Sequence, residues 1–452
     1  MELKNKRVLV VGMATSGIPT VKTLSKLGAK ISINDIKSKE QLSDILDEIG
    51  NFCSELILGE HPERTENYDL IVLSPGVPTD LAFLKKAKEE KVNIIGELEL
   101  AFRLSKGKYV AITGTNGKTT TTALTGEIFK NAKHETFVVG NIGLAAISKA
   151  LETTDNTILV TEVSSFQLES IETFRPKISA ILNITPDHLN RHKTMGNYID
   201  AKANIFRNQC GDDILILNYD NDETRKLASR ANCKVVFFSR SSALDEGCYV
   251  EDNNIVFKND KVKETICNID DIYIAGNHNL ENALAATIFA KYSGINKDVI
   301  KYTLKNFKGI EHRTEFVDEI NGVKFYNDSK GTNPDASIKA VEGLKGPLIL
   351  IAGGMDKGSS FDEFVGAFND KVKTLVLLGE TANKIKETAE GLGFKNIFIV
   401  KNMEEAVEKA YEEAVDKDTI LLSPACASWD MYKSFEVRGK HFKDCVNNLR
   451  SV

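Results

Sequence analysis

The sequence predicts an α/β protein made of three successive domains, each with a mostly parallel sheet. Short apolar runs alternate with helix-length amphipathic segments along the 452 residues. Such alternation is typical of parallel strands whose helices pack on the faces of the sheet. One hydrophobic core rarely extends over a chain of this length, and a prior of about 150 residues per domain suggests three domains.

Three groups of predicted strands divide the chain. They are residues 8–11, 31–33 and 70–73, then 110–112, 158–160, 178–182 and 214–217, and finally 348–352, 374–378, 397–400 and 419–422. We place the boundaries near residues 95–97 and 308–309. The expected domains are therefore 1–96, 97–308 and 309–452, of which the first and third are Rossmann-like and the central one carries a phosphate loop.

Composition excludes several classes of function. Hydrophobic residues make up 42% and charged residues 27% of the chain, as in ordinary globular proteins. With a net charge of -6, neither nucleic acid nor an anionic membrane is an expected partner. The seven cysteines are scattered without the paired spacing of a zinc site or a disulfide framework. The N-terminal residues lack a signal-peptide core, and no apolar run is long enough to span a bilayer, so we expect a cytoplasmic protein.

A phosphate loop stands between a predicted strand and helix in residues 109–122. Its pattern is the shortened form Gly114-x-x-Gly117-Lys118-Thr119, because Ile112 occupies the position of the usual first glycine. Backbone N–H groups of the turn, the helix N-terminus and the Lys118 ammonium suit phosphate oxygens. The Thr119 hydroxyl suits Mg²⁺. The motif predicts nucleotide binding.

The first domain begins with a modified dinucleotide fingerprint in residues 7–18. Ala14 replaces the middle glycine, which disfavours a standard NAD site, while Asp35 follows the second predicted strand. Ser74 and Gly76 end another strand and could close over the same ligand. A diphosphate site and a purely structural sheet both remain open for this domain.

Three further polar residues of the central domain could act on a nucleotide. Glu162 ends an apolar strand, where a carboxylate suits Mg²⁺, and His188 follows the next strand, where Asp187 could orient its ring. Lys202 lies on a predicted amphipathic helix. Spacing alone predicts a solvent-facing lysine there.

Several motifs together resemble the muramyl peptide ligases, and the resemblance covers the whole chain. The motifs are residues 113–120, 140–143, 162–168, 187–189, 276–279 and 312–313. Within this family, residues 327–333 and 423–439 resemble the D-glutamate-adding members. The Asp-Asn-Pro-Arg segment of the diaminopimelate-adding members does not occur in the sequence.

The resemblance implies a ligase that adds D-glutamate to UDP-N-acetylmuramoyl-L-alanine for peptidoglycan precursor synthesis. ATP would convert the L-alanine carboxylate to an acyl phosphate, and the D-glutamate amine would then attack through a tetrahedral intermediate. Two Mg²⁺ ions are expected, together with a carbamate formed from CO₂ on Lys202. The resemblance also implies a monomer that binds small molecules only. It assigns no general base.

The resemblance assigns roles residue by residue. The implied catalytic residues are Lys118, Glu162, His188 and Lys202, and the implied metal ligands are Thr119, Glu162, His188 and Lys202. The ATP residues are Gly114, Thr115, Asn116, Gly117, Lys118, Thr119, Thr120, Asn277, Arg313 and Asp328. The residues for the UDP substrate are Thr15, Ser16, Asp35, Ser74, Gly76, Asn141, Ser164 and Gln167. The D-glutamate residues are Lys330, Thr332, Lys357, Ser428 and Phe435.

Three alternatives compete with this interpretation. The chain could be another ligase of the superfamily that uses a different amino acid. It could also have a folylpolyglutamate-synthase-like activity, although an enzyme of that kind should lack the first domain. It could be a non-catalytic module whose phosphate loop only binds nucleotide. An NAD-dependent oxidoreductase would depend on Gly12 and Gly17 alone and would leave the central domain unexplained.

Overall fold

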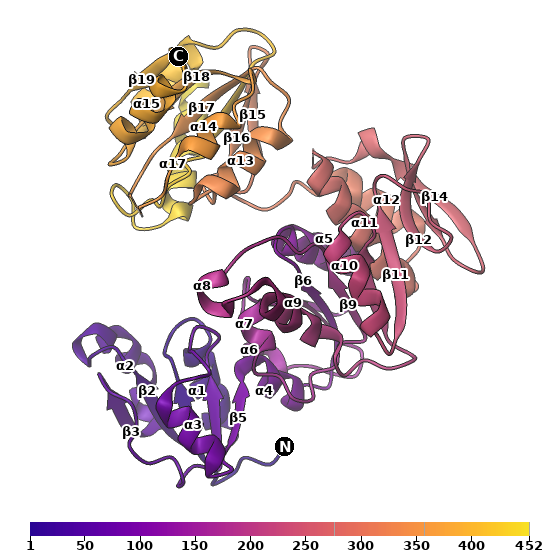
Figure 1. Ribbon diagram of the computed structural model, residues 1–452, viewed down its shortest axis with the longest axis vertical. Coiled ribbons are helices and arrows are strands. Elements are labelled where there is room, and N and C mark those ends of the chain that lie inside the picture. Colours follow the sequence, from indigo (N-terminus) through magenta and orange to yellow (C-terminus); the bar gives the residue numbers. More distant parts are fainter. Residues whose placement is uncertain (275, 357, 452) are drawn as a thin grey trace. The chain divides into compact units, whose positions relative to one another are not determined.

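The computed structural model describes residues 1–274, 276–356 and 358–451, and confirms the predicted α/β fold class. Its contacts form two compact units. One unit contains Met1–Asp271 and Glu281–Lys305, and the other contains Ile272–Leu280 and Asn306–Val452. Figure 1 labels many of the elements of both units. Among the described residues, no helix has both the length and the apolar character that a membrane span requires.

The first sheet has five parallel strands in the order β3-β2-β1-β4-β5. Its strands are β1 (Arg7–Val11), β2 (Lys30–Asp35), β3 (Cys53–Leu58), β4 (Leu70–Leu73) and β5 (Asn93–Gly96). The helices α1 (Gly17–Lys26), α2 (Ser43–Ile49) and α3 (Ala82–Glu89) connect them. Because β1 lies next to both β2 and β4, the loops that follow these three strands meet at one edge of the sheet.

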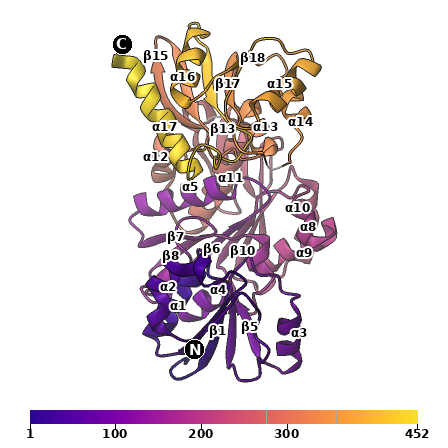
Figure 2. The ribbon, with the colours of Figure 1, turned by 90° about the vertical axis from the view of Figure 1, so that its left-hand side faces the viewer.

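The second sheet has nine strands in the order β14-β13-β12-β11-β10-β9-β6-β8-β7. Strand β6 lies between β8 on one side and β9 and β10 on the other. Figure 2 labels β8 and β10 on the two sides of β6. The parallel strands are β6 (Lys108–Thr113), β7 (Thr136–Gly140), β8 (Ile158–Glu162), β9 (Ile178–Ile181), β10 (Ile214–Asn218), β11 (Lys234–Ser239) and β12 (Gly247–Glu251). Strands β13 (Asn254–Lys258) and β14 (Lys263–Asn268) extend the sheet as antiparallel hairpins.

Helices surround this sheet and complete the first unit. They are α4 (Glu97–Leu104), α5 (Lys118–Asn131), α6 (Ile147–Ala150), α7 (Ser165–Leu168), α8 (Leu189–His192), α9 (Met195–Ala203), α10 (Asp222–Leu227), α11 (Asn277–Tyr292) and α12 (Lys297–Asn306). Helices α4 and α6 pack together, and a single hydrophobic cluster runs from the first sheet into the second. Helix α11 begins in the other unit.

The third sheet has the order β15-β16-β20-β17-β18-β19 and is parallel except for the β15–β16 hairpin. Its strands are β15 (Glu315–Ile320), β16 (Val323–Asn327), β17 (Leu348–Ala352), β18 (Val372–Leu377), β19 (Ile397–Ile399) and β20 (Thr419–Leu422). Its helices are α13 (Pro334–Gly343), α14 (Asp362–Gly366), α15 (Ala382–Gly391), α16 (Met403–Glu412) and α17 (Phe435–Asn448). Short 3₁₀ turns occupy Glu40–Leu42, Gly50–Phe52, Asn204–Phe206, Ala228–Arg230, Ile269–Asp271 and Leu449–Ser451.

The central strands of the third sheet are buried on both faces. Along β17, Leu348 and Leu350 belong to one hydrophobic cluster, while Ile349 and Ile351 belong to another on the opposite face. Successive side chains of a strand point to opposite faces, so a strand covered by helices on both sides becomes a continuous apolar run. Such runs are the ones that the sequence analysis identified. Each predicted strand is found, with ends that shift by a residue or two.

Candidate active site

The phosphate loop joins the central strand β6 to α5 through two glycines in unusual backbone conformations. Gly114 has φ 152° and Gly117 has φ 82°, a region that side chains disfavour. A Cβ atom on Gly117 would lie 2.3 Å from the Oδ1 atom of Asn282. The turn is therefore restricted to glycine both by its backbone conformation and by the close approach of α11.

Lys118 and Lys202 meet at the carbonyl oxygen of Gly114. The Nζ atom of Lys118 lies 2.9 Å from this oxygen and 2.8 Å from the Thr115 carbonyl oxygen. The Nζ atom of Lys202, on α9, donates to the Gly114 oxygen from 2.8 Å. Lys202 is only 2% exposed, so the solvent-facing position that spacing alone favours is wrong.

The environment of Lys202 opposes a positive charge. Burial and then the positive charge of Lys118 lower its pKa well below the usual value, while Asp187 and Glu162 act in the other direction. The Nζ atom also lies 4.6 Å from the centre of the Tyr198 ring. A buried amine with a lowered pKa is nucleophilic because more of it carries a free lone pair.

Glu162 places a carboxylate at the end of β8, next to β6. It is 2% exposed, and its Oε1 accepts a hydrogen bond from Asn141 Nδ2 at 3.0 Å. Its Oε2 is buried and has no hydrogen-bond partner among the residues that the structure describes. An orphaned buried carboxylate oxygen fits a hard cation such as Mg²⁺. The first turn of α5 adds the buried residues Thr119 and Thr120 to this edge.

His188 precedes α8 in a left-handed conformation, with φ 52°. Its Nε2 lies 3.5 Å from Asp187 Oδ2, and its ring packs 5.0 Å from the Phe166 ring. The side chain is about half exposed, at 49%, which leaves the imidazole accessible from solvent.

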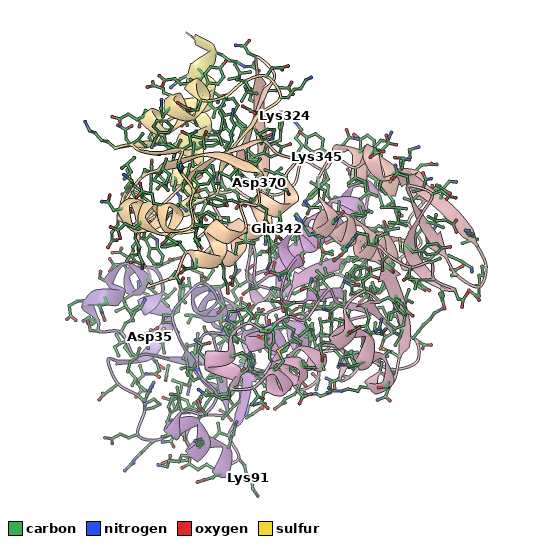
Figure 3. All side chains as sticks on the ribbon, turned by 45° about the horizontal axis from the view of Figure 1, so that its top comes forward. Asp35, Lys91, Lys324, Glu342, Lys345 and Asp370 are labelled. Atoms are coloured by element: carbon green, nitrogen blue, oxygen red, sulfur yellow. The ribbon has the colours of Figure 1, made fainter. Side chains whose placement is uncertain are left out.

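The candidate UDP residues of the first domain meet at the loops after β1, β2 and β4. Asp35, labelled in Figure 3, accepts the Met13 N–H at 2.7 Å and thereby fixes the loop after β1. Ser16 Oγ donates to Ser74 Oγ at 3.0 Å, and Ser74 Oγ donates to the Gly12 carbonyl at 2.7 Å. Thr15 and Gly76 are exposed beside these contacts.

Ser164 and Gln167, which were expected to face the same substrate, also cap helix α7. The Ser164 Oγ accepts the Gln167 N–H, and the Gln167 side chain accepts the Ser164 N–H at 2.9 Å. This is a capping box, and its Ser-x-x-Gln spacing can be recognised in the sequence. Gln167 is buried, whereas Asn141 is exposed directly after β7.

The three remaining ATP candidates belong to the other unit. Asp328 is buried and accepts hydrogen bonds from Ser423 Oγ at 2.7 Å and the Thr314 N–H at 3.1 Å. Burial raises the pKa of Asp328 to about 6, against the opposing effects of Ser423 and Arg313. Arg313 is half-buried, and Asn277 is an exposed residue at the start of α11.

The D-glutamate candidates lie on two loops and the start of α17. Lys330 Nζ is 5.8 Å from the centre of the Phe435 ring, and the Thr332 N–H donates to the Lys330 carbonyl at 2.9 Å. Ser428 is buried, and its carbonyl accepts the Tyr432 N–H at 2.7 Å. Lys357 lies outside the described residues.

Family models match each of the three parts of the chain. They are a Mur ligase MurD-like N-terminal domain at residues 6–96, a Mur ligase middle domain at 112–290 and a Mur ligase glutamate ligase domain at 312–426. A protein of Alkaliphilus oremlandii named UDP-N-acetylmuramoylalanine–D-glutamate ligase is 58% identical, with 100% of both chains covered. One of the same name from Clostridioides difficile is 55% identical, again over 100% of both chains. The chain belongs to the Mur ligase family.

Solved structures of Mur ligases share the fold of this one. The UDP-N-acetylmuramate-alanine ligase of Thermotoga maritima superposes with a TM-score of 0.60 at 19% identity, covering 99% of each chain. A MurF ligase of the same organism in complex with ADP has a TM-score of 0.58 at 16% identity, covering 93% of this chain and 95% of the other. These structures show the fold, and the family models and the two relatives confirm the resemblance inferred from the motifs.

Asn183 is a residue of this Mur ligase that the sequence analysis did not assign to the site. Its carbonyl accepts the Thr115 N–H at 2.9 Å and its Oδ1 accepts the Asn116 N–H at 2.8 Å. Its Nδ2 donates back to the Asn116 carbonyl at 3.2 Å. Asn183 therefore holds the phosphate loop from the segment that follows β9, although no spacing signal marks it.

Arg191 and Arg438 are two further unassigned residues of this Mur ligase. Arg191, in α8, donates to the Gly76 and Val77 carbonyls at 3.3 and 3.2 Å. Its guanidinium is held by Glu169 at 2.6 Å. The central domain thus anchors the loop that ends β4. Arg438 is 3% exposed and donates to backbone carbonyls of both loops that carry the D-glutamate candidates.

Proposed function

We propose that this Mur ligase joins D-glutamate to UDP-N-acetylmuramoyl-L-alanine at the expense of ATP, with Lys118, Glu162, His188 and Lys202 as catalytic residues. The observation that carries the proposal is the meeting of Lys118 and Lys202 at the Gly114 carbonyl of the phosphate loop. A loop that only binds nucleotide has no need of a second, deeply buried lysine. An activating site for a carboxylate does, because a carbamate on this lysine would help to hold a second Mg²⁺, and phosphoryl transfer to an anion requires concentrated positive charge.

Amide synthesis needs ATP because a carboxylate is a poor acyl donor. The L-alanine carboxylate attacks the γ-phosphate, and ADP and an acyl phosphate form. Lys118 neutralises charge on the phosphoryl oxygens, and the N–H groups of the loop hold the phosphates. The D-glutamate amine then attacks the acyl carbon, and the tetrahedral intermediate expels phosphate. The proton of the amine passes to water or phosphate.

Two Mg²⁺ ions fit the polar residues at this edge of the sheet. Thr119 and Glu162 would hold one, since Glu162 Oε2 is a buried oxygen without a described donor. His188 and Lys202 would hold the other. When bound, Mg²⁺ neutralises the charge that phosphoryl transfer spreads over the oxygens.

Lys202 would serve as a metal ligand only as a carbamate. Its nitrogen bonds to the carbon of CO₂ and releases a proton, which replaces a cation by an anionic oxygen ligand. The low pKa of the buried amine supports this step, because CO₂ reacts with the neutral form. A carbamate oxygen is a hard ligand of the type that Mg²⁺ prefers.

The remaining candidate residues would bind the three substrates. The loops of Thr15, Ser16, Asp35, Ser74 and Gly76 would hold the uridine diphosphate, and Asn141, Ser164 and Gln167 the muramoyl-alanine part. Asn277, Arg313 and Asp328 would contact ATP. Lys330 and Lys357, with Thr332, Ser428 and Phe435, would neutralise and orient the two carboxylates of D-glutamate.

We place the three domains at residues 1–96, 97–308 and 309–452. The reaction belongs to peptidoglycan precursor synthesis, and we infer that it takes place in the cytoplasm on small molecules. A monomer suffices, because one chain supplies a candidate group for each substrate.

The test is a ligation assay on the full chain. The protein is incubated with ATP, Mg²⁺, bicarbonate, UDP-N-acetylmuramoyl-L-alanine and one amino acid at a time, and phosphate release and product mass are followed. We expect a ligated product with D-glutamate alone. Lys118→Ala and Lys202→Ala should each lower turnover at least about a hundredfold. Lys130→Ala is the matched control, because Lys130 is exposed at the far end of α5.

Each other outcome changes a defined part of the proposal. A product with another amino acid keeps the mechanism but overturns the D-glutamate assignment, and no phosphate release with any amino acid favours a nucleotide-binding module. Isotopically labelled bicarbonate tests the carbamate separately by NMR. A carbamate carbon resonance is expected in the parent protein and not in Lys202→Ala, and a signal in both would exclude Lys202 as its carrier.

A further inference from the structure

A cluster of three metal-ligating side chains lies in the second unit, apart from every residue assigned above. Glu404 from α16 meets His441 and Cys445 from α17, and one ligand atom of each lies within 4.8 Å of the others. Glu404 is exposed, His441 is half-buried and Cys445 is buried. The cluster thus reaches from solvent to the core between two packed helices.

The helix geometry explains why these side chains meet. His441 and Cys445 are four residues apart on α17, so they lie on the same face, one turn from each other. Glu404 stands in the first turn of α16. His441 Nε2 lies 2.9 Å from Glu404 Oε1, which fixes the ring between the carboxylate and the thiol.

We propose that Glu404, His441 and Cys445 bind a Zn²⁺ ion, with water as the fourth ligand. Zn²⁺ takes imidazole nitrogen, thiolate sulfur and carboxylate oxygen in a tetrahedral arrangement, and these are the three donor types present. Mg²⁺ prefers oxygen ligands in octahedral geometry, so the cation of the proposed ligation reaction does not suit this cluster. The scattered cysteines gave no zinc signal in the sequence, because one ligand comes from a separate helix.

Tyr432 contacts the ring nitrogen of His441 that would face away from the ion. Its hydroxyl lies 2.9 Å from His441 Nδ1. In the metal-free protein, the phenol can donate to Nδ1 while the Nε2–H donates to Glu404. With Zn²⁺ bound, Nδ1–H donates to the Tyr432 oxygen and the Nε2 lone pair faces the ion. Histidine ligands are commonly oriented in this way through their other ring nitrogen.

The charges around Cys445 favour a cation. Burial raises the pKa of its thiol to about 11, and the negative charges of Glu404, Asp444 and Glu408 contribute in the same direction. When the S–Zn bond forms, the S–H bond breaks and one proton leaves to solvent, which keeps the step balanced. The same three carboxylates attract the incoming ion.

The bound ion would tie α16 to α17. Helix α17 carries Phe435 in its first turn and Arg438 in its second, and both residues belong to the candidate D-glutamate region. The ion is thus a structural clamp on the helix that positions part of this region. It takes no part in the ligation chemistry.

The experiment is a titration of the metal-free full chain with Co²⁺, a spectroscopic substitute for Zn²⁺. We expect one equivalent to give a thiolate-to-cobalt charge-transfer band, which Zn²⁺ then removes. The residues proposed for Mg²⁺ include no thiol, so Co²⁺ bound there gives no such band. Cys445→Ser should abolish the band, and Cys210→Ser, a matched loss of an exposed thiol, should retain it.

Two further variants keep the test decisive if Cys445→Ser is poorly folded. Glu404→Gln changes an exposed side chain and should weaken Co²⁺ binding at least tenfold. Tyr432→Phe should weaken Co²⁺ binding about 10–100-fold, because it removes the hydroxyl that orients the His441 ring. The proposal is overturned if the parent gives no band at saturating Co²⁺, if the band survives in Cys445→Ser, or if both other variants bind Co²⁺ as tightly as the parent.

Discussion

Arg438 offers the sharpest test of how the D-glutamate region is held together. Its Nε donates to Ser329 Oγ at 3.0 Å and its Nη2 to the Ser329 carbonyl at 2.8 Å. Both terminal nitrogens donate to the Cys426 carbonyl at 3.1 Å, and Nη1 also reaches the Ala427 carbonyl at 3.3 Å. Burial lowers the pKa of this guanidinium to about 10, so it remains charged at neutral pH. The perturbation is Arg438→Lys, which keeps the charge.

The expected loss of stability follows from the number of hydrogen-bond donors that the substitution removes. The guanidinium makes five hydrogen bonds, whereas a lysine ammonium has three N–H groups on one nitrogen, so at least two bonds are lost. Hydrogen bonds to a charged group contribute about 1.5–3 kcal/mol each, so the variant should lose about 3–6 kcal/mol of stability. At about 2–4 °C per kcal/mol for a domain of this size, the melting temperature should fall by roughly 10 °C.

The functional effect follows from which segments are released. Ser329 precedes Lys330, and Ala427 precedes Ser428, so the freed backbone carries two D-glutamate candidates. We expect the KM for D-glutamate to rise about tenfold, equivalent to about 1.4 kcal/mol of binding, while the KM for UDP-N-acetylmuramoyl-L-alanine stays unchanged. Calorimetry gives the melting temperature, and phosphate release gives both KM values.

Arg450→Lys is the matched control for this substitution. Arg450 is 59% exposed and pairs with Asp318 at the surface, so its replacement should change stability by less than about 0.5 kcal/mol. An Arg438→Lys protein with the parent's melting temperature and KM for D-glutamate would refute the inference that the guanidinium holds the two loops. Equal losses in both variants would refute the role of burial.

Three other perturbations test separate parts of the structure. Arg191→Ala frees two carbonyls of the 74–78 loop, so the KM for the UDP substrate should rise about tenfold, and an unchanged KM would show that the loop needs no anchor. Gly117→Ala should abolish the binding of a fluorescent ATP analogue, because φ at this position is 82° and the new Cβ would lie 2.3 Å from Asn282 Oδ1. Tight binding of the analogue by this variant would contradict the prediction. Burial raises the pKa of Glu97 from 4.5 to about 7. Its contribution to stability is therefore complete below pH 4.5 and is lost between pH 4.5 and 7. Glu97→Gln should remove this loss of about 3 kcal/mol of stability, measured by denaturant titrations between pH 4.5 and 7. A variant whose stability still falls by the same amount over this pH range would exclude Glu97 as the cause of the loss.

The sequence predicted the parallel strands better than the hairpins, for a physical reason. A strand buried on both faces, such as β17, is a continuous apolar run that stands out from its surroundings. The hairpin of β12 and β13 has only five residues in each strand, and only some of them are buried. The sequence feature that indicates this hairpin is the turn at Asp252 and Asn253, because Asp and Asn tolerate the positive φ that both residues adopt. A prediction from runs of apolar residues does not detect such a turn.

Lys202 shows the limit of periodicity at the site itself. On α9 its helical position alone predicted an exposed lysine, whereas the structure buries it. Its partner, the Gly114 carbonyl, is 88 residues away in the chain, and only the packing of α9 against the phosphate loop brings the two together. The family resemblance assigned Lys202 a role as an expected metal ligand. The burial itself required the structure.

The residues missed entirely share a different property. Asn183, Arg191 and Arg438 bond mainly to backbone amides and carbonyls of other segments. Every residue offers the same backbone groups, so such a contact leaves no complementary side chain elsewhere in the sequence to reveal it. The phosphate loop is recognisable because its glycines, lysine and threonine are matched to a ligand of fixed chemistry. The supporting contacts depend only on which backbone segments the fold brings near Asn183, Arg191 and Arg438. The sequence pattern does not predict these approaches between distant segments.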